Sequence, residues 1–225
     1  MFIIVDFRLF VVIIGSFVLI WTGCASPIHT LEIYNNGQPK FAREYKVISN
    51  GLRKDSITVK LIKYYRNGMR QYQQDIINNQ ANGQYISWHL TGVKSAKGRY
   101  LNGELSDKWI WWGKDGLPDS IRTFRNEMLH GEYIDYFGNG KPHKLMEYVE
   151  NKKYGYYKEL DEKGKKVSIG EYRNDIPHGN WVWWQNRIKT RELTYENGLK
   201  NGPFRIYDKL GKKKIIGQYK NDKKD

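Results

Sequence analysis

Short runs of alternating apolar and polar residues recur along the chain, and each is bounded by a glycine-containing turn pair. The segment GEYIDYF, residues 131–137, is one such run, and Asn139-Gly140 follows it closely. Alternation with a period of two is typical of a β-strand with one buried face. An Asn-Gly pair between two such runs is typical of a tight hairpin turn. The pattern therefore predicts antiparallel β-hairpins.

The pattern returns at a nearly fixed period, which indicates a repeat architecture. A first glycine position recurs every 24 residues, and after 23 in the last case, with Asp107 in the place of one glycine. We interpret these residues as structural turn glycines: Gly83, Gly131, Gly155, Gly179 and Gly202. A second turn position is held by Gly37, Gly68, Gly92, Gly116, Gly140, Gly164 and Gly211, and by Asn186-Arg187 in one unit.

Two strands and two turns per unit predict an all-β fold. We expect an elongated, single-layer antiparallel meander of about eight β-hairpins, roughly 24 residues each, after an N-terminal signal helix. The interval from Gly37 to Gly68 is 31 residues, which corresponds to one unit with seven inserted residues. Aromatic residues at equivalent positions are expected to stack between neighbouring hairpins. They are Tyr85, Trp109, Tyr133, Tyr157, Trp181 and Phe204.

The N-terminal segment differs from the repeats. An uncharged apolar run of 13 residues extends from Leu9 to Trp21. This is short of the roughly 20 residues that span a bilayer and fits the apolar region of a secretory signal. Cys24, the sole cysteine, follows this run and Gly23. It cannot form a disulfide within the chain.

The sequence WTGC, residues 21–24, resembles the bacterial lipoprotein signal, although Trp21 stands where that pattern prefers leucine. The resemblance implies a signal peptide over 1–23, a lipidated Cys24 as the mature N-terminus, a short tether over 24–30 and a repeat domain over 31–225. Ala25, in place of aspartate after the cysteine, implies by similarity to enterobacterial sorting the outer rather than the inner membrane of the cell envelope. An uncleaved membrane anchor and a cytosolic protein remain as alternatives.

The repeats themselves resemble MORN-type repeats in their bacterial variant. The stretches HGEYIDYFGNGKPHKLMEY, residues 130–148, and HGNWVWWQNRIKTRELTY, residues 178–195, carry this resemblance, which covers nearly all of the chain after residue 31. MORN repeats are associated with membrane-lipid contact and with protein assembly. Some bacterial proteins with this variant are labelled antitoxin components, which implies neutralisation of a toxic partner by direct binding.

The charge balance restricts the class of binding partner less than the repeat pattern does. Lys and Arg total 38 against 24 acidic residues, a formal net charge of +14. Such a surface attracts anionic lipid, acidic glycan or nucleic acid, but it also keeps an aromatic-rich sheet soluble. Export would argue against nucleic acid. The lysine-rich C-terminal strand discourages pairing with a second chain, so we predict a monomer.

The candidate chemistry does not converge on one point. His130 and His178 share a repeat phase but lie two units apart, about 19 Å at the spacing of strands in a sheet. They cannot share a metal ion, and no nucleophile or phosphate-binding motif is present. The carboxylates alternate with Lys and Arg along the strands, as expected for cross-strand pairs. We predict no enzyme activity, no metal site and no cofactor.

Surface recognition remains, and two tryptophan clusters are the candidate surface for a ligand or partner: Trp109, Trp111 and Trp112, and Trp181, Trp183 and Trp184. Because neighbouring strand residues point to opposite faces, each cluster is expected to place rings on both sides of the sheet. The function predicted is a non-enzymatic, membrane-anchored lipoprotein whose repeat sheet serves as a binding or scaffolding surface for a protein, glycan or anionic lipid. The alternative is an antitoxin- or immunity-type protein that neutralises a toxic partner by direct binding.

Overall fold

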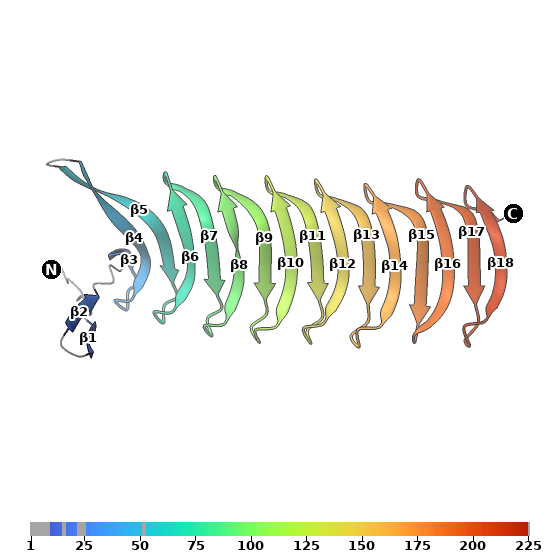
Figure 1. Ribbon diagram of the computed structural model, residues 1–225, viewed down its shortest axis with the longest axis horizontal. Coiled ribbons are helices and arrows are strands. Elements are labelled where there is room, and N and C mark those ends of the chain that lie inside the picture. Colours follow the sequence, from blue (N-terminus) through green and yellow to red (C-terminus); the bar gives the residue numbers. More distant parts are fainter. Residues whose placement is uncertain (1–9, 15–16, 22–25, 51–52, 225) are drawn as a thin grey trace.

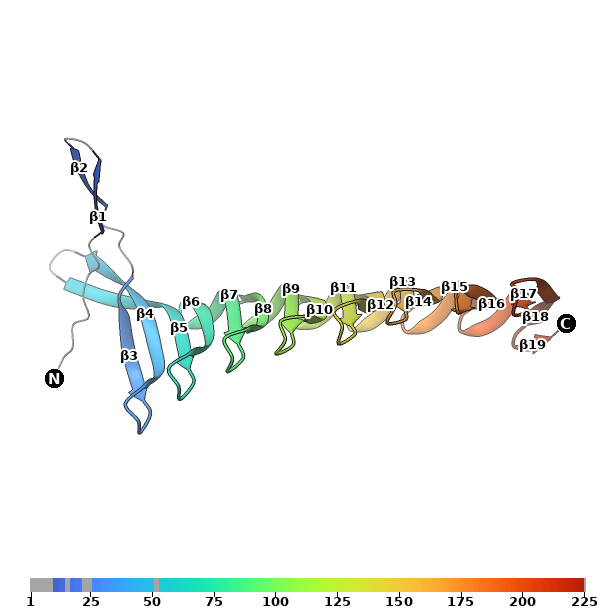
Figure 2. The ribbon, with the colours of Figure 1, turned by 90° about the horizontal axis from the view of Figure 1, so that it is seen from below.

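The computed structural model describes residues 10–14, 17–21, 26–50 and 53–224. Among them, β3 to β19 form one open antiparallel meander in which each strand pairs with its neighbours in the chain. The end strands β3 and β19 pair with β4 and β18 and lie at opposite ends (Figures 1 and 2). The predicted all-β meander of repeated hairpins is confirmed. The strands are β1 (Phe10–Ile14), β2 (Phe17–Trp21), β3 (Ile28–Ile33), β4 (Pro39–Asn50), β5 (Arg53–Tyr64), β6 (Arg70–Ile77), β7 (Gln80–Trp88), β8 (Lys94–Leu101), β9 (Glu104–Trp112), β10 (Pro118–Arg125), β11 (Met128–Tyr136), β12 (Pro142–Val149), β13 (Lys152–Leu160), β14 (Lys166–Arg173), β15 (Ile176–Gln185), β16 (Ile188–Glu196), β17 (Leu199–Tyr207), β18 (Lys213–Lys220) and β19 (Lys223–Lys224).

The predicted signal helix falls mostly on residues outside those described. Residues 10–14 and 17–21 form the short strands β1 and β2, which pair with each other, and the expectation of a helix stays a prediction.

Two kinds of turn alternate along the meander. At one margin a two-residue turn joins the strands, with positive φ at both central residues, as at Asn174 (49°) and Asp175 (67°). At the other margin a longer turn closes with a glycine, as where the Gly140 N–H donates to the Phe137 carbonyl oxygen at 2.8 Å. Asn186 and Arg187, with φ of 52° and 71°, replace the longer turn by the two-residue kind. The turn expected at this pair is confirmed, and it is shorter than its equivalents in the other units.

The five glycines predicted as turn residues lie inside strands instead. Their left-handed backbone is present, with φ between 67° and 118°, but each belongs to a bulge. In one example, Ile169 pairs with Val182 and Glu171 pairs with His178. Between these two pairs, the single residue Gly170 of β14 lies opposite three residues of β15, Gly179, Asn180 and Trp181. The extra residues bend the strand, and the strands are bowed in Figure 1. The glycines therefore set the curvature of the sheet, which corrects their assignment to turns.

Asp107 occupies this bulge position in β9 and adopts the same left-handed backbone, with φ of 60°. This conformation is strained for a residue with a Cβ, whereas glycine adopts it freely. We expect Asp107→Gly to raise the free energy of unfolding by about 0.5–1 kcal/mol, because the exposed ion pair between Asp107 and Arg99, 4.0 Å apart, contributes little. Asp107→Ala should lower it by about 1 kcal/mol. Denaturant titration of both variants checks this, and equal effects would contradict it.

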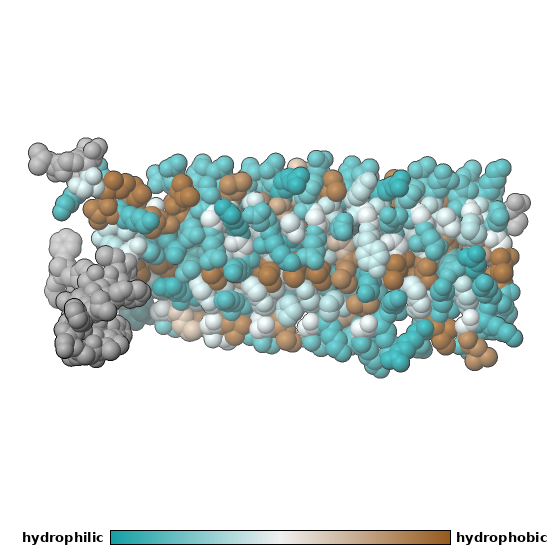
Figure 3. Space-filling model, in the orientation of Figure 1, coloured by the Kyte–Doolittle hydropathy of each residue, from teal (hydrophilic) through white to brown (hydrophobic). Residues whose placement is uncertain are grey.

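The aromatic row predicted from the repeat forms the core of the sheet. Tyr157 and Trp181 are buried together with Met146, and Trp109 and Phe204 occupy equivalent buried positions. On the face seen in Figure 3, hydrophilic side chains predominate and apolar ones form small separate groups.

The seven inserted residues lengthen β4 and β5 to 12 residues each, and this hairpin extends past its neighbours in Figure 1. It exposes Val47, Ile48 and Ile57. The two edges of the sheet differ. At the C-terminal edge, β18 is rich in lysine, as predicted. At the opposite edge, all six residues of β3 are exposed. The predicted monomer stays a prediction.

Candidate functional site

The six tryptophans of the candidate surface are not equally accessible. Trp109 and Trp181 are only 3% and 5% exposed and belong to the core row. The other four, Trp111, Trp112, Trp183 and Trp184, are half-buried. Burial therefore restricts contact with a ligand or partner to these four rings.

A stacked array runs along the sheet through the first cluster. The ring of Trp109 lies 5.4 Å from that of Tyr85 and 5.7 Å from that of Trp111, with interplanar angles of 33° and 24°. The guanidinium of Arg122 lies 5.2 Å from the Trp111 ring, and 5.3 Å from Tyr133 beyond it. A cation over an aromatic face is attracted by the negative charge of that face. Trp111 is thus held between a buried indole and an arginine.

A similar array recurs three hairpins further along, but its arginine lies in a different row: Arg191 pairs with Trp183 itself, whereas Arg122 pairs with Trp109. Trp181 lies 5.5 Å from Tyr157 and 5.7 Å from Trp183, and Arg191 lies 4.1 Å from the Trp183 ring. Trp109 and Trp111, and likewise Trp181 and Trp183, stack on one face of the sheet, as residues two apart on a strand should. Trp112 and Trp184 come after a register shift at the strand ends.

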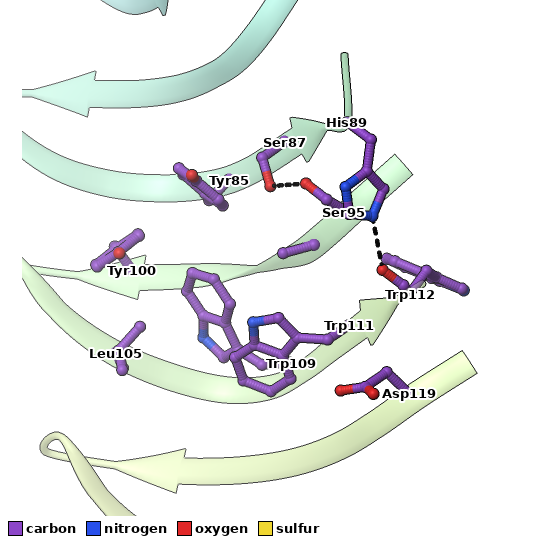
Figure 4. A pocket seen from close by; sticks show the side chains of 11 residues that line it. Tyr85, Ser87, His89, Ser95, Tyr100, Leu105, Trp109, Trp111, Trp112 and Asp119 are labelled. Carbon is purple, nitrogen blue, oxygen red and sulfur yellow. Dashed lines mark hydrogen bonds between the residues drawn. The ribbon is translucent and has the colours of Figure 1, made fainter. Parts of the chain in front are cut away.

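A hollow of about 510 Å³ lies beside the first array (Figure 4). The rings of Tyr85, Trp109 and Trp111 are among those that line it. It exists because two small residues, Ser87 and Ala96, occupy neighbouring strands directly before Trp111 in the same cross-strand row.

Polar groups surround these rings. The hydroxyls of Ser87 and Ser95 are 2.8 Å apart. The Nε2–H of His89 donates to the Trp112 carbonyl oxygen at 2.9 Å, because that oxygen can only accept. Figure 4 shows both bonds, and it places Asp119 on the opposite side of Trp111 from the serines. Asp119 is exposed. The hollow thus combines aromatic surface with hydroxyl and carboxylate groups.

The equivalent place beside the second array is lined by different side chains. Glu159 holds the position in its hairpin that Ser87 holds three hairpins earlier, in the cross-strand row that leads to the tryptophan. Its carboxylate accepts hydrogen bonds from Ser168 at 3.0 Å and from Tyr157 at 3.2 Å. A larger, charged side chain thus stands in place of the serine, so the two arrays share an aromatic framework but offer different surfaces.

Burial in the aromatic row or beside it changes the acidity of several tyrosines. Desolvation is the largest cause that raises the pKa of each of these hydroxyls above 10: Tyr72, Tyr100, Tyr133, Tyr148, Tyr157 and Tyr172. The pKa shift is large for Tyr157, where the nearby Glu159 carboxylate adds to desolvation.

A pKa that is higher in the folded than in the unfolded chain means that the folded state favours the protonated tyrosine. The resulting stabilisation is complete below the unfolded pKa and is lost as pH rises through the folded pKa. Stability should therefore be constant with respect to these tyrosines up to about pH 10, and it should fall as pH rises above that value. Denaturant titrations across this range, with tyrosinate absorbance as a second readout, check the prediction. Tyr157→Phe should make the alkaline fall shallower. An unchanged slope in that variant would contradict the assignment.

Three expectations from the sequence concern lipidation at Cys24, a metal site and the membrane, and the described residues bear on them only in part. Cys24 lies outside them. In the part of the chain that the structure describes, no group of three or more His, Cys, Asp or Glu side chains could hold a metal ion. Within the same part, no helix is long and apolar enough to cross a membrane.

Several residues of the site were missed by reasoning from the sequence. Gly98, Gly170 and Gly217 share one phase, six residues after the turn position, and each lies against a ring of the core row. Arg122 occupies that same phase in another unit. Alignment of the units at this position could have found them. The hollow depends on Ser87 and Ala96, and their small size carries no signal without knowledge of the strand pairing.

The chain matches no protein-family model, and no curated protein is significantly similar to it in sequence. The resemblance to MORN-type repeats therefore rests on the repeat pattern itself and stays a prediction.

Proposed function

We propose that this protein is a non-enzymatic lipoprotein, anchored in the bacterial cell envelope through Cys24, whose repeat sheet is a binding surface. The observation that carries the binding role is an aromatic-lined hollow on a single-layer sheet, where half-buried tryptophans reach solvent. An extended repeat surface of this kind suits recognition. Function must still be argued from its sites, because one fold serves many roles.

The anchoring role is supported by the N-terminal sequence. The apolar run from Leu9 to Trp21 precedes Gly23-Cys24, and the first strand of the meander begins at Ile28. An acylated Cys24 would be held to the bilayer by about 0.8 kcal/mol for each buried methylene group. Only a short tether would then separate the sheet from the membrane surface.

Cell fractionation tests the anchor. In its native host, the protein should sediment with membranes, resist high-salt washing and dissolve in detergent. The salt wash matters because the net charge of +14 could hold the protein on anionic lipid without an anchor. The Cys24→Ala variant should lose the salt-resistant fraction. A wild-type protein found in the soluble fraction would contradict the proposal and favour a cytosolic, toxin-neutralising role.

A further inference from the structure

We infer that the long hairpin of β4 and β5 inserts its tip into the headgroup region of the bilayer beside the anchor, with a preference for anionic lipid. This inference rests on the proposed anchoring at Cys24 and adds a second membrane contact, made by described residues. The contact belongs to the part of the hairpin that extends past its neighbours in Figure 1, residues 46–57, which we call the protruding hairpin.

The protruding hairpin begins where the chain enters the sheet. The Tyr45 N–H donates to the Pro27 carbonyl oxygen at 3.2 Å, directly before residue 46. Cys24 lies three residues upstream of Pro27, and three residues span at most about 11 Å. A lipid on Cys24 therefore keeps the bilayer surface within about this distance of the base of the protruding hairpin.

The protruding hairpin is long enough to meet that surface. In the regular unit that contains β12, Tyr148 holds the position of Tyr45, and the strand ends at the next residue, Val149. Strand β4 continues four residues further than this, to Asn50, which adds about 13 Å. Because Pro27 lies beside this margin of the sheet, the anchor and the tip of the hairpin are on the same side of the molecule.

The protruding hairpin exposes apolar side chains on both of its faces. Ile48 and Ile57 are 46% and 47% exposed, and the strand pairing places them on one face together with Lys46. Val47, 57% exposed, points to the other face. A flat protein surface would cover only one of these faces, whereas a lipid surface into which the hairpin inserts surrounds both.

The charges of the protruding hairpin favour anionic lipid. Residues 46–57 include three basic residues, Lys46, Arg53 and Lys54, against one acidic residue, Asp55. The side chains of Lys46 and Lys54 are exposed. Basic residues next to a membrane are attracted by the negative surface potential of anionic headgroups. Apolar and basic side chains together are typical of segments that lie in the membrane interface.

Backbone hydrogen bonding limits the depth of insertion. Of the strands that the structure describes, only β5 pairs with β4 beyond Glu44, and only β4 pairs with β5 on the tip side of Lys60. Both outer edges of the protruding hairpin thus carry backbone groups that need other partners. Such groups are costly in hydrocarbon, but water and phosphate oxygens in the headgroup region can satisfy them. The tip is therefore expected at headgroup depth and not in the centre of the bilayer.

A dye at the tip measures this depth. Ile48→Cys introduces a thiol for an environment-sensitive dye. Leu90→Cys is the matched control, because Leu90 is 57% exposed and lies in a longer turn at the opposite margin. Cys24 is the sole native cysteine, and a lipid on its sulfur leaves no free thiol. The full chain of each variant is purified in detergent, labelled, and reconstituted in liposomes of phosphatidylcholine with or without phosphatidylglycerol. Circular dichroism of each variant must match the wild type.

We expect a headgroup spin label to quench the dye at position 48 at least about twofold more strongly than the dye at position 90. Quenching at position 48 should increase with phosphatidylglycerol, and a spin label at the end of the acyl chain should quench neither dye. Adding Lys54→Glu should remove the increase, whereas Lys114→Glu, an exposed lysine at the opposite margin, should not.

Two kinds of failure are distinguishable. Equal quenching at positions 48 and 90, or strong quenching from the end of the acyl chain, would overturn the inference and leave the anchor standing. Incorporation of dye into the wild type would reveal a free thiol at Cys24, and it would reject the anchor together with the inference.

Discussion

Trp181→Ala is expected to lower the free energy of unfolding by about 3–5 kcal/mol, the cost of deleting a large buried aromatic side chain. Trp181 is buried among Tyr157, Tyr172, Trp183 and Tyr195, with ring centroids 5.0–6.4 Å away. Its Nε1–H also donates to the Glu171 carbonyl oxygen at 3.1 Å. The substitution removes the packing against these rings and the hydrogen bond at once.

The matched control is Trp184→Ala, which removes the same side chain three residues away. Trp184 is half-buried, and Lys166 lies 5.5 Å from its ring. We expect the loss of stability in this variant to be well under half that in Trp181→Ala. Denaturant titration followed by near-ultraviolet circular dichroism measures both. Equal losses would show that the aromatic row is not the core of the sheet.

Gly170→Ala should lower the free energy of unfolding by about 1–3 kcal/mol, because it overpacks the core. A Cβ at Gly170 would lie 2.1 Å from the Trp181 ring, which is impossible without displacement of the indole. The absence of a side chain at Gly170 therefore leaves the space that the Trp181 ring occupies. The backbone φ at this position is not in the left-handed region, so the loss of stability would reflect the steric clash and not the turn geometry.

Two further variants isolate this steric effect. Gly138→Ala adds a methyl group where no atom lies within 4 Å and the φ is not positive, so it should change stability by less than about 0.5 kcal/mol. In the Trp181→Ala background, Gly170→Ala should have little effect, because the clash is gone and the two sites are coupled. Additive losses of stability in the double variant would contradict a direct contact between Gly170 and Trp181.

The sequence predicted the architecture because each unit repeats its local signals. Asn-Gly and Asn-Asp pairs accept the positive φ that two-residue turns require, and Asn102-Gly103 and Asn174-Asp175 form such turns. Asn139-Gly140, from which a tight turn was also predicted, lies in the longer kind of turn instead. The alternating runs between the turns mark the strands. The turn at Asn186-Arg187 was also recognisable, because this pair stands where the other units have their second turn glycine. Both residues adopt positive φ, 52° and 71°.

The bulges were not predictable in the same way. A glycine such as Gly155 signals positive φ but does not say whether the backbone turns back or bends within a strand. That choice depends on the partner strand, where Met146 pairs with Tyr157 and Tyr148 pairs with Lys153. The same dependence on pairing explains why the tryptophans divide into core and surface residues.

The candidate site was only partly accessible from the sequence for a related reason. The tryptophan clusters identify the part of the sheet concerned, but the hollow exists because Ser87 and Ala96 meet beside Trp111 across three strands. Side-chain size at two positions, rather than a motif, separates this place from the second array, where Glu159 lies.

The intact mass of the protein extracted from native membranes tests the central proposal most directly. We predict a species that begins at Cys24 and carries added acyl mass, and the loss of that species in the Cys24→Ala variant. The sheet would then be displayed at the cell envelope. An unmodified full-length chain in the soluble fraction would contradict the account.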